Sequence, residues 1–258
     1  MNSKTAWLIV AKTSLHVGNE NTSNYGLIDK AVQRDAVTGL PCINSSSLKG
    51  AINEYASQCM KKTLTDIQRK AIFGVDKLDK NSETSKGNTA FFDADILALP
   101  RPNDTSLYEL VSSDAVLSRY CERLTTFGMN LTVAQLKEKI KSLLEVSQIV
   151  TTLPNGDTQT SGCTPDFRIC PNDEFADYCS DYELPIIARN HLDNGKSTNL
   201  WYEQVLPRET VFGTLILAAD ETLTNALNEG IVQIGANATV GYGYCKFIQI
   251  AKSEEHAQ

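Results

Sequence analysis

The 258-residue sequence lacks any apolar run near the roughly 18 residues that a membrane-spanning helix requires. A strand-like segment follows directly after Met-Asn-Ser-Lys at the start, so we expect neither a signal peptide nor a membrane span. The seven cysteines include no Cys-x-x-Cys pair, and their odd number argues against a disulfide framework or a zinc ribbon. These absences predict a cytoplasmic protein with reduced thiols.

A basic excess is also missing. The chain has 24 Lys and Arg against 31 Asp and Glu, a net charge of −7, whereas a stand-alone nucleic-acid-binding protein usually has a basic excess. The sequence pI of about 5.1 and three histidines far apart in the sequence argue against an RNA-processing nuclease that acts alone. One local basic face could still bind nucleic acid if other subunits of an assembly supply positive charge.

What is present indicates an α+β fold. Apolar, β-branched runs predict strands, and apolar residues spaced i, i+3, i+4, i+7 predict helices. The core elements in chain order are a strand (5–13), a helix (46–60), a strand ended by Pro100 (89–99), a strand (210–219), a helix (221–229) and a strand (244–251). This βαββαβ order is that of a ferredoxin-like or RNA-recognition-motif core, here within one domain spanning 1–258 and with large helical insertions.

The insertions between these elements have weaker patterns. The first insertion has a helix that begins at the capping box of Thr65 and ends at Gly74, and an exposed loop follows over 76–88. The second is the insertion region 101–182. It has two helices within 106–146, separated near Gly128, and its last part, 154–182, has no pattern that lets us place it. After them, strand-like runs at 184–190 and 200–206 flank a polar segment whose Asp193-Asn-Gly suits a turn. We therefore expect a β-hairpin that projects from the body over 183–207.

The start of the first helix could bind an anion. Lys49 is poorly matched to the positive end of the helix dipole, and Gly50 is about 1 kcal/mol less favourable than Ala in a helix. A phosphate held by free amides, by the hydroxyls of Ser46 and Ser47 and by the lysine would explain both residues. A serine N-cap beside an incidental lysine explains them equally well, so both interpretations stay open.

A glycine-rich loop over 235–243 separates the last helix from the last strand. Gly235, Gly241 and Gly243 permit close approach of a ligand, and Tyr242 could stack on a base. The alternative is a tight helix-to-strand connection. Because the loop precedes a strand rather than a helix, it is not a dinucleotide-binding motif.

Five side chains are acid–base or metal-binding candidates: His16, Asp29, Asp93, Asp95 and Glu203. Asp93 and Asp95 share one face of a predicted strand and could bind a divalent cation, although such pairs are more often solvated or paired with a lysine. Asp29 lies in a long irregular stretch (14–45), where a carboxylate could hold a metal or orient a 2′-hydroxyl, or could simply decorate the surface. His16 follows a core strand, where most histidines are structural.

Several segments together resemble the RAMP superfamily of CRISPR effector proteins, in particular the backbone subunits of type III-B Cmr complexes. The segments are Leu15-His-Val-Gly18, Gly26-Leu-Ile-Asp-Lys-Ala-Val-Gln-Arg34, and residues 38–50, 200–212 and 233–243. They occur in family order and span both ends of the chain. The sequence departs from the family pattern at Asn44-Ser45, where Pro-Gly is usual, and at Ala236, where a second glycine is usual, so we expect altered loop conformation there.

The resemblance implies an RNA-recognition-motif-like subunit that assembles with other Cmr subunits and with copies of itself as a helical filament along a guide RNA. It implies metal-dependent cleavage of single-stranded target RNA beside a thumb hairpin, with weakly bound Mg²⁺ or Mn²⁺. Asp29 matches the family's essential aspartate and would be both the catalytic and the metal-binding residue. The helix-opening serines and Lys49 match the guide-backbone contact, Arg189 on the thumb would face RNA, and His16 and Glu203 would lie near the cut. The alternative is a non-catalytic RNA-binding scaffold, which the presence of Asp29 disfavours.

Overall fold

The computed structural model describes residues 3–18, 28–60, 63–75, 85–104, 106–145, 150–152, 156, 158–160, 165–218 and 220–254. Its centre is a nine-stranded sheet with the main order β12-β13-β1-β11-β4-β5-β8, to which β2 adds beside β4 and β3 beside β11. The strands are β1 (Ser3–Ala11), β2 (Cys42–Ile43), β3 (Ala90–Phe91), β4 (Ala94–Arg101), β5 (Glu109–Ser113), β8 (Asp166–Cys170), β11 (Val211–Leu217), β12 (Ile231–Gln233) and β13 (Tyr244–Glu254). All pairs are antiparallel except β5 with β8.

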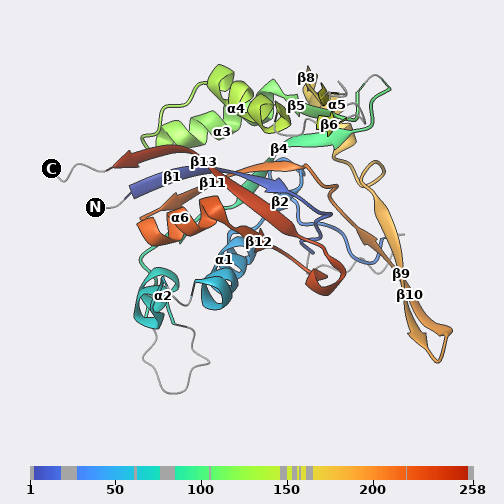
Figure 1. The fold of residues 1–258 in the computed structure, drawn as a ribbon, viewed down its shortest axis with the longest axis horizontal. Helices are drawn as coiled ribbons and strands as arrows, with labels where there is room; N and C mark the ends of the chain where they lie inside the picture. The colour runs from blue at the N-terminus through green and yellow to red at the C-terminus, as the bar shows by residue number, and fades with distance from the viewer. Residues whose placement is uncertain are drawn as a thin grey trace.

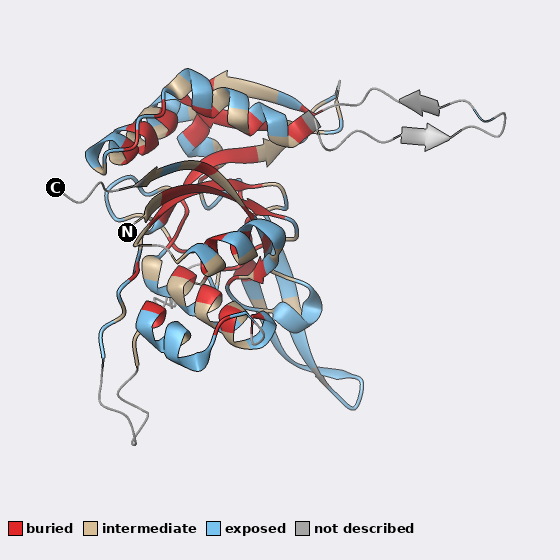
Figure 2. Ribbon diagram, turned by 60° about the vertical axis from the view of Figure 1, so that its left-hand side comes forward, coloured by how far each residue is buried: buried red, intermediate tan, exposed pale blue. Residues whose placement is uncertain are grey.

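Helices cover both faces of this sheet (Figures 1 and 2). The helices α1 (Ser45–Cys59), α2 (Asp66–Phe73) and α6 (Glu221–Glu229) lie on one face, and α3 (Asp114–Thr126) and α4 (Val133–Glu145) on the other. The strands alternate between the two resulting cores: Trp7 and Ile9 of β1 pack toward α1 and α6, whereas Leu8 and Val10 pack toward α3 and α4. None of the described helices is long and apolar enough to cross a membrane.

The core elements confirm most of the sequence prediction. The predicted helices 46–60 and 221–229 are α1 and α6, and apolar spacing buries Leu48, Ile52 and Ala56 on one stripe of α1. The capping box at Thr65 opens α2, which ends at Gly74, and a second such box at Thr132 opens α4. The predicted strands 5–13, 210–219 and 244–251 are β1, β11 and β13.

Two predictions on either side of Arg101 are wrong. The strand predicted over 89–99 is two strands, β3 and β4, and Pro100 does not end β4 but pairs with Leu110. At Pro100 β4 pairs with β5 but no longer with β11, so the missing N–H of proline costs no ladder bond on the β11 side. Residues 109–113, predicted as helix, form β5. They pair with β4 on one side and with β8, more than fifty residues further along the chain, on the other.

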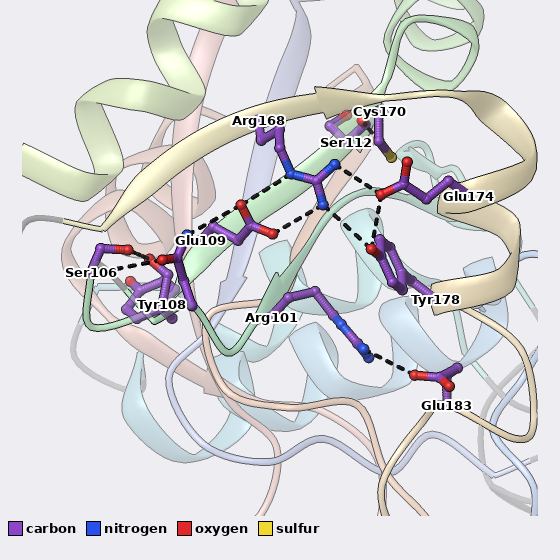
Figure 3. Close-up of polar contacts among 11 residues, drawn as sticks. Arg101, Ser106, Tyr108, Glu109, Ser112, Arg168, Cys170, Glu174, Tyr178 and Glu183 are labelled. Atoms are coloured by element: carbon purple, nitrogen blue, oxygen red, sulfur yellow. Dashed lines mark hydrogen bonds and ion pairs between the residues drawn. The ribbon is translucent and has the colours of Figure 1, made fainter.

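The stretch 154–182, which the sequence did not place, contains β8 and the short helix α5 (Asn172–Tyr178). Arg168 of β8 holds these elements together (Figure 3). Its guanidinium donates two parallel hydrogen bonds to Glu109 of β5, each 3.0 Å, and one of 2.9 Å to Glu174 of α5. Two short strands, β6 (Val150–Thr152) and β7 (Thr158–Thr160), pair with each other. Of the exposed loop predicted over 76–88, residues 76–84 lie outside the described residues.

The predicted hairpin is present as β9 (Ile186–Asp193) and β10 (Lys196–Gln204), and we call it the thumb hairpin. Its two turn residues, Asn194 and Gly195, both have positive φ, 48° and 78°, as a tight two-residue hairpin turn requires. The strands run through the segment predicted as a polar loop, so the hairpin is longer than its apolar runs suggest. It forms its own two-stranded sheet and projects away from the body (Figure 1).

Candidate functional site at the base of the thumb hairpin

The base of the thumb hairpin is where segments from both ends of the chain meet. Isolated β-bridges join Leu15 to Leu206, Gly18 to Val32, and Lys30 to Glu203. The segments 15–18 and 28–34 therefore run beside each other and beside the end of β10. This arrangement brings His16, Asp29 and Glu203, all sequence-predicted candidates, to one part of the molecule.

Asp29 is exposed at the surface of this base. The Tyr202 amide donates a 2.7 Å hydrogen bond to Oδ2 of Asp29, and the Asp29 amide donates one of 3.1 Å to the Tyr202 carbonyl oxygen. One carboxylate oxygen is thus fixed to the backbone of β10. The other, Oδ1, has no hydrogen bond to any part of the chain that the structure describes, so it is available to a ligand.

Glu203 directly follows Tyr202 in β10, but unlike the exposed Asp29 it is buried, with only 1% of its side chain exposed. Oε1 accepts from the Trp201 indole at 2.7 Å and pairs with the Lys30 ammonium at 3.0 Å. Oε2 accepts from the Asn237 amide at 2.8 Å and pairs with Arg189 at 3.5 Å. We call these five residues the Glu203 cluster.

The electrostatics of the Glu203 cluster favour an ionised glutamate. Burial raises the pKa of the Glu203 carboxyl, but the hydrogen bonds from Trp201, Lys30 and Asn237 lower it, and the balance holds this pKa below its usual value. Both oxygens are occupied by protein donors from three separate segments. The geometry therefore suits Glu203 to positioning the thumb base rather than to contact with a reacting atom.

His16 is buried, with 2% of its surface exposed. Its Nδ1 lies 2.7 Å from the Gln204 carbonyl oxygen, which can only accept, so Nδ1 carries a proton. The His16 carbonyl oxygen in turn accepts a 2.9 Å bond from Ala236 in the glycine-rich loop. A Cβ at Gly235, where φ is +80°, would collide with that carbonyl oxygen, which explains the glycine.

The glycine-rich loop lies against the thumb hairpin. The Arg189 guanidinium sits over the Tyr242 ring at 5.7 Å from its centroid, and Lys30 sits over the Trp201 ring at 5.2 Å. Arg189, which we expected to face RNA, is 22% exposed and already contacts Glu203 and the Tyr242 ring. An RNA phosphate would therefore have to share the guanidinium with these two residues. Gly241 and Gly243 also have positive φ, as a turn between a 3₁₀ segment (Ala238–Val240) and β13 requires.

The start of α1 bears on one of the two interpretations left open above, and phosphate binding there stays a prediction. Asn44 is the N-cap residue and its side chain forms no capping hydrogen bond, so a serine is not the N-cap of α1. The Ser45 amide donates instead to the Asp93 carboxylate. Ser47 accepts a 3.1 Å bond from the Gln33 side chain, which connects α1 to the segment that carries Asp29. Ser46 and Gly50 are exposed and Lys49 is half-buried, all on the surface of α1.

Asp93 and Asp95 have protein partners that account for them. Asp93 lies in the break between β3 and β4 at the α1 start, and Asp95 forms a 2.6 Å ion pair with Arg123 of α3. Burial raises the pKa of Asp95, and the arginine works against that rise. Among the described residues there is no group of three or more His, Cys, Asp or Glu side chains that could hold a metal ion.

Sequence reasoning missed the residues that connect these parts. They are Lys30, Gln33, Trp201, Gln204 and Asn237. All five fall inside the segments that resemble the RAMP superfamily, which is the only signal in the sequence that could have singled them out. Their roles depend on contacts between residues up to about two hundred positions apart, which no local pattern records.

The architecture defines a class: a mixed α/β protein with one large sheet, helices on both faces, and a projecting hairpin beside an exposed aspartate. Within that class the chain belongs to the RAMP superfamily, whose profile matches residues 8–246. It is 26% identical over 278 residues to the CRISPR system Cmr endoribonuclease Cmr4 of Pyrococcus furiosus (strain ATCC 43587 / DSM 3638 / JCM 8422 / Vc1), with 91% of each chain covered.

Solved structures with the same fold include two from Cmr systems. A chain from the type III-B Cmr-beta complex bound to cognate target RNA superposes with a TM-score of 0.68 at 21% identity, covering 95% of this chain and 96% of that one. Oligomeric Cmr4 from Pyrococcus furiosus superposes with a TM-score of 0.63 at 21% identity, covering 97% and 98%. The mixed α/β fold with its large sheet is therefore that of these proteins.

Proposed function

We propose that this chain is the backbone subunit of a type III-B CRISPR complex, which binds guide RNA and cleaves complementary single-stranded target RNA at regular intervals. Membership of the RAMP superfamily and a relative named an endoribonuclease over 91% of both chains support the proposal. The likeness to a chain of an RNA-bound Cmr complex and to an oligomeric relative supports assembly with other Cmr subunits and with further copies as a filament.

The core would be of the ferredoxin-like, RNA-recognition-motif type. The order β13-β1-β11-β4, all antiparallel, with α1 and α6 on one face, supports this assignment. The opposite face is packed against α3 and α4, so RNA would not lie on an open sheet face. It would instead follow the edge where the thumb base and the start of α1 are found.

One observation carries the catalytic part: Asp29 is an exposed carboxylate with one oxygen fixed to β10 and the other available. Fixing Oδ2 limits the rotation of the side chain, so Oδ1 is held in one direction at the root of the thumb hairpin. A general base that is already oriented loses little entropy on meeting its substrate. The Glu203 cluster keeps β10, and therefore Asp29, in place.

The reaction would proceed by attack of a target 2′-hydroxyl on the neighbouring phosphate. Asp29 Oδ1 accepts the hydroxyl proton while the 2′-oxygen forms a bond to phosphorus and the bond from phosphorus to the 5′-oxygen breaks. The departing 5′-oxygen takes a proton from water. The products are a 2′,3′-cyclic phosphate and a 5′-hydroxyl end. The thumb hairpin would turn the backbone toward the in-line geometry that this attack needs.

A divalent ion, Mg²⁺ or Mn²⁺, is part of the proposal. The single free oxygen of Asp29, Oδ1, would not coordinate the ion while it accepts the hydroxyl proton, so water and RNA phosphate would supply most of the ligands, and binding would be weak. Bound there, the ion would neutralise the negative charge that develops on the phosphate. Lys30, next to Asp29 in the sequence, is 48% exposed, and its ammonium is paired with Glu203.

The test is target cleavage by the complex reconstituted with guide RNA, with wild-type chain or Asp29→Ala, and with Mg²⁺, Mn²⁺ or chelator. We expect evenly spaced products with cyclic phosphate ends that need the metal and disappear in the variant, while target binding is retained. Tight guide and target binding without cleavage in either protein would contradict the catalytic part and make the chain an RNA-binding scaffold.

A further inference from the structure

A groove on the α1–α2 side of the molecule has an unusual charge for this acidic chain. It has a volume of about 610 Å³ and lies between α1, α2 and residues 85–87. The residues that line it are Ser46, Lys49, Gly50, Asn53, Arg69, Lys70, Phe73, Gly74, Val75, Ser85, Lys86 and Gly87. Four of these are cationic and none is acidic, although the whole chain has seven more acidic than basic residues. We call this feature the α1–α2 groove.

The cations of the groove are available to a ligand. The ammonium groups of Lys49, Lys70 and Lys86 form no hydrogen bond or ion pair within the described part of the chain, and Lys70 and Lys86 are exposed. Arg69 is oriented by a 2.9 Å bond to Asn53 of α1 and by Asp66 at 3.8 Å. Lysines without partners in a concave site, beside an arginine already fixed in direction, suit a chain of phosphates better than a single small anion.

The local backbone shows how Lys86 reaches the groove. Residues 85–88 pack against the end of α2 through a β-bridge between Gly74 and Lys86 and a 2.8 Å bond from the Asn88 amide to the Ala71 carbonyl oxygen. A Cβ at Gly87 would collide with the Ile72 carbonyl oxygen, so only glycine permits this approach. The side chain of Lys86 is thereby placed across the groove from α1.

The groove is continuous with the candidate site. Ser46, Lys49 and Gly50 at the start of α1 belong to it, and Ser47 beside them is bonded to Gln33. Gln33 follows Val32, whose amide donates to the Gln204 side chain at the end of β10. The start of α1 therefore borders both the groove and the segment that leads to the thumb base, so an RNA strand bound at the thumb base would be close to the groove.

We propose that the α1–α2 groove is a second phosphodiester-binding site, in which Arg69, Lys70 and Lys86 hold the backbone of the guide strand after it leaves the α1 start. This inference rests on the proposed function, because it assumes that the chain binds RNA. Contacts of this kind read charge and not sequence, so they would add affinity equally for every guide.

The test measures binding of single-stranded RNA to the full-length chain over a salt series, with wild type and Lys70→Gln/Lys86→Gln. The matched control is Lys139→Gln/Lys141→Gln on α4, which removes the same charge from the opposite side of the sheet. Each phosphate contact to single-stranded RNA contributes about 0.7 to the slope of log affinity against log salt, so the groove variant should lose about 1.4. We expect its affinity to fall about tenfold, equally for two unrelated RNA sequences, and the control to match wild type.

Three results would overturn the groove assignment. One is a groove variant with wild-type affinity and slope, and another is an equal loss in the α4 control. The third is a variant that keeps its RNA affinity but loses self-association, which would make the groove a protein contact. Failure of the wild-type chain to bind RNA at any salt is a different outcome, because it would overturn the proposed function itself.

Discussion

Two clusters of charged residues illustrate how differently this molecule uses the same chemistry. The Arg168 cluster surrounds one arginine with Glu109, Glu174 and Tyr178, and the neighbouring Arg101 stacks on Tyr178 at 4.4 Å and pairs with Glu183 (Figure 3). The Glu203 cluster surrounds one glutamate with donors. By geometry alone the Arg168 cluster is the stronger, since its bond to Glu109 is bidentate and its hydrogen bonds raise the pKa of Arg168 further above its normal value.

The difference lies in what each cluster holds together. All partners of Arg168 come from residues 101–183, so that cluster fixes β5, β8 and α5 to one another. The Glu203 cluster joins residue 30, the thumb hairpin and the glycine-rich loop, and it stands beside a carboxylate with a free oxygen. Bond geometry therefore does not separate the two clusters by function, and our proposed site rests on the adjacent Asp29 carboxylate with its unused oxygen.

The largest effect should come from removing the centre of the Glu203 cluster. Glu203→Ala leaves the Trp201 indole, the Asn237 amide and Arg189 without their shared acceptor, and each donor left unsatisfied costs about 1–3 kcal/mol, so we expect a loss of about 3 kcal/mol. Lys30 is 48% exposed, so water screens its loss of a partner. Urea unfolding should show this loss of stability, and the same variant should bring target cleavage down with it. Glu203→Gln keeps the shape of the side chain but not its charge, so its stability and cleavage rate should lie between those of wild type and Glu203→Ala. Wild-type stability in Glu203→Ala would show that the cluster does not hold the thumb base.

A second, smaller effect isolates the contact between the glycine-rich loop and His16. Gly235→Ala should destabilise by about 2 kcal/mol or more, because φ is +80° and the new Cβ meets the His16 carbonyl oxygen. Gly241→Ala is the matched control, since φ is +84° but no atom lies within 4 Å of the added Cβ. The difference in unfolding free energy between the two variants measures the collision. Equal values would mean that the loop is free to move away.

Removing the centre of the Arg168 cluster should separate stability from activity. Arg168→Ala leaves Glu109, with 14% of its side chain exposed, without its main partner. We expect a loss of about 1–2 kcal/mol, lower than for Glu203→Ala because the arginine is 36% exposed and screened by water. The cleavage rate per folded complex should stay at the wild-type value. A loss of rate larger than the loss of folded protein would break the comparison between the two clusters.

The smallest effect concerns pH. Because the pKa of Glu203 is lower in the folded chain than the unfolded value of about 4.3, ionised Glu203 stabilises the fold above that value, and the contribution disappears as pH falls through the folded pKa. The stability difference between wild type and Glu203→Gln should therefore shrink below about pH 4. Unfolding measured from neutral to acid pH checks this, and a constant difference would show that another carboxylate governs acid sensitivity.

How far the sequence predicted this structure follows from how local each signal is. The stripe of Leu48, Ile52 and Ala56 and the turn at Asn194-Gly195 depend on neighbouring residues, and both were predicted correctly. β5 was mistaken for helix because it is short, runs directly into α3, and is defined only by its pairing with β4 and β8. A strand of this kind has no signature apart from its partners.

The site divides in the same way. Asp29 was already a candidate because it lies in a long irregular stretch, but only the resemblance to the RAMP superfamily set it apart from the other candidates, because a loop aspartate has no pattern of its own. Glu203 was placed near the cut by the same resemblance, but its burial and its four donors could not be foreseen. The donors lie at positions 30, 189, 201 and 237, and only the folded chain brings them together.

The most direct test of the account is the single-turnover cleavage rate of target RNA fully bound to complexes that carry wild type, Asp29→Asn or Glu174→Gln. The two variants each replace one carboxylate by an amide, one beside the Glu203 cluster and one in the Arg168 cluster. We predict that Asp29→Asn lowers the rate by at least about 100-fold at unchanged target affinity, and that Glu174→Gln leaves the rate unaltered. A wild-type rate in Asp29→Asn would contradict the assignment of Asp29 as the catalytic carboxylate.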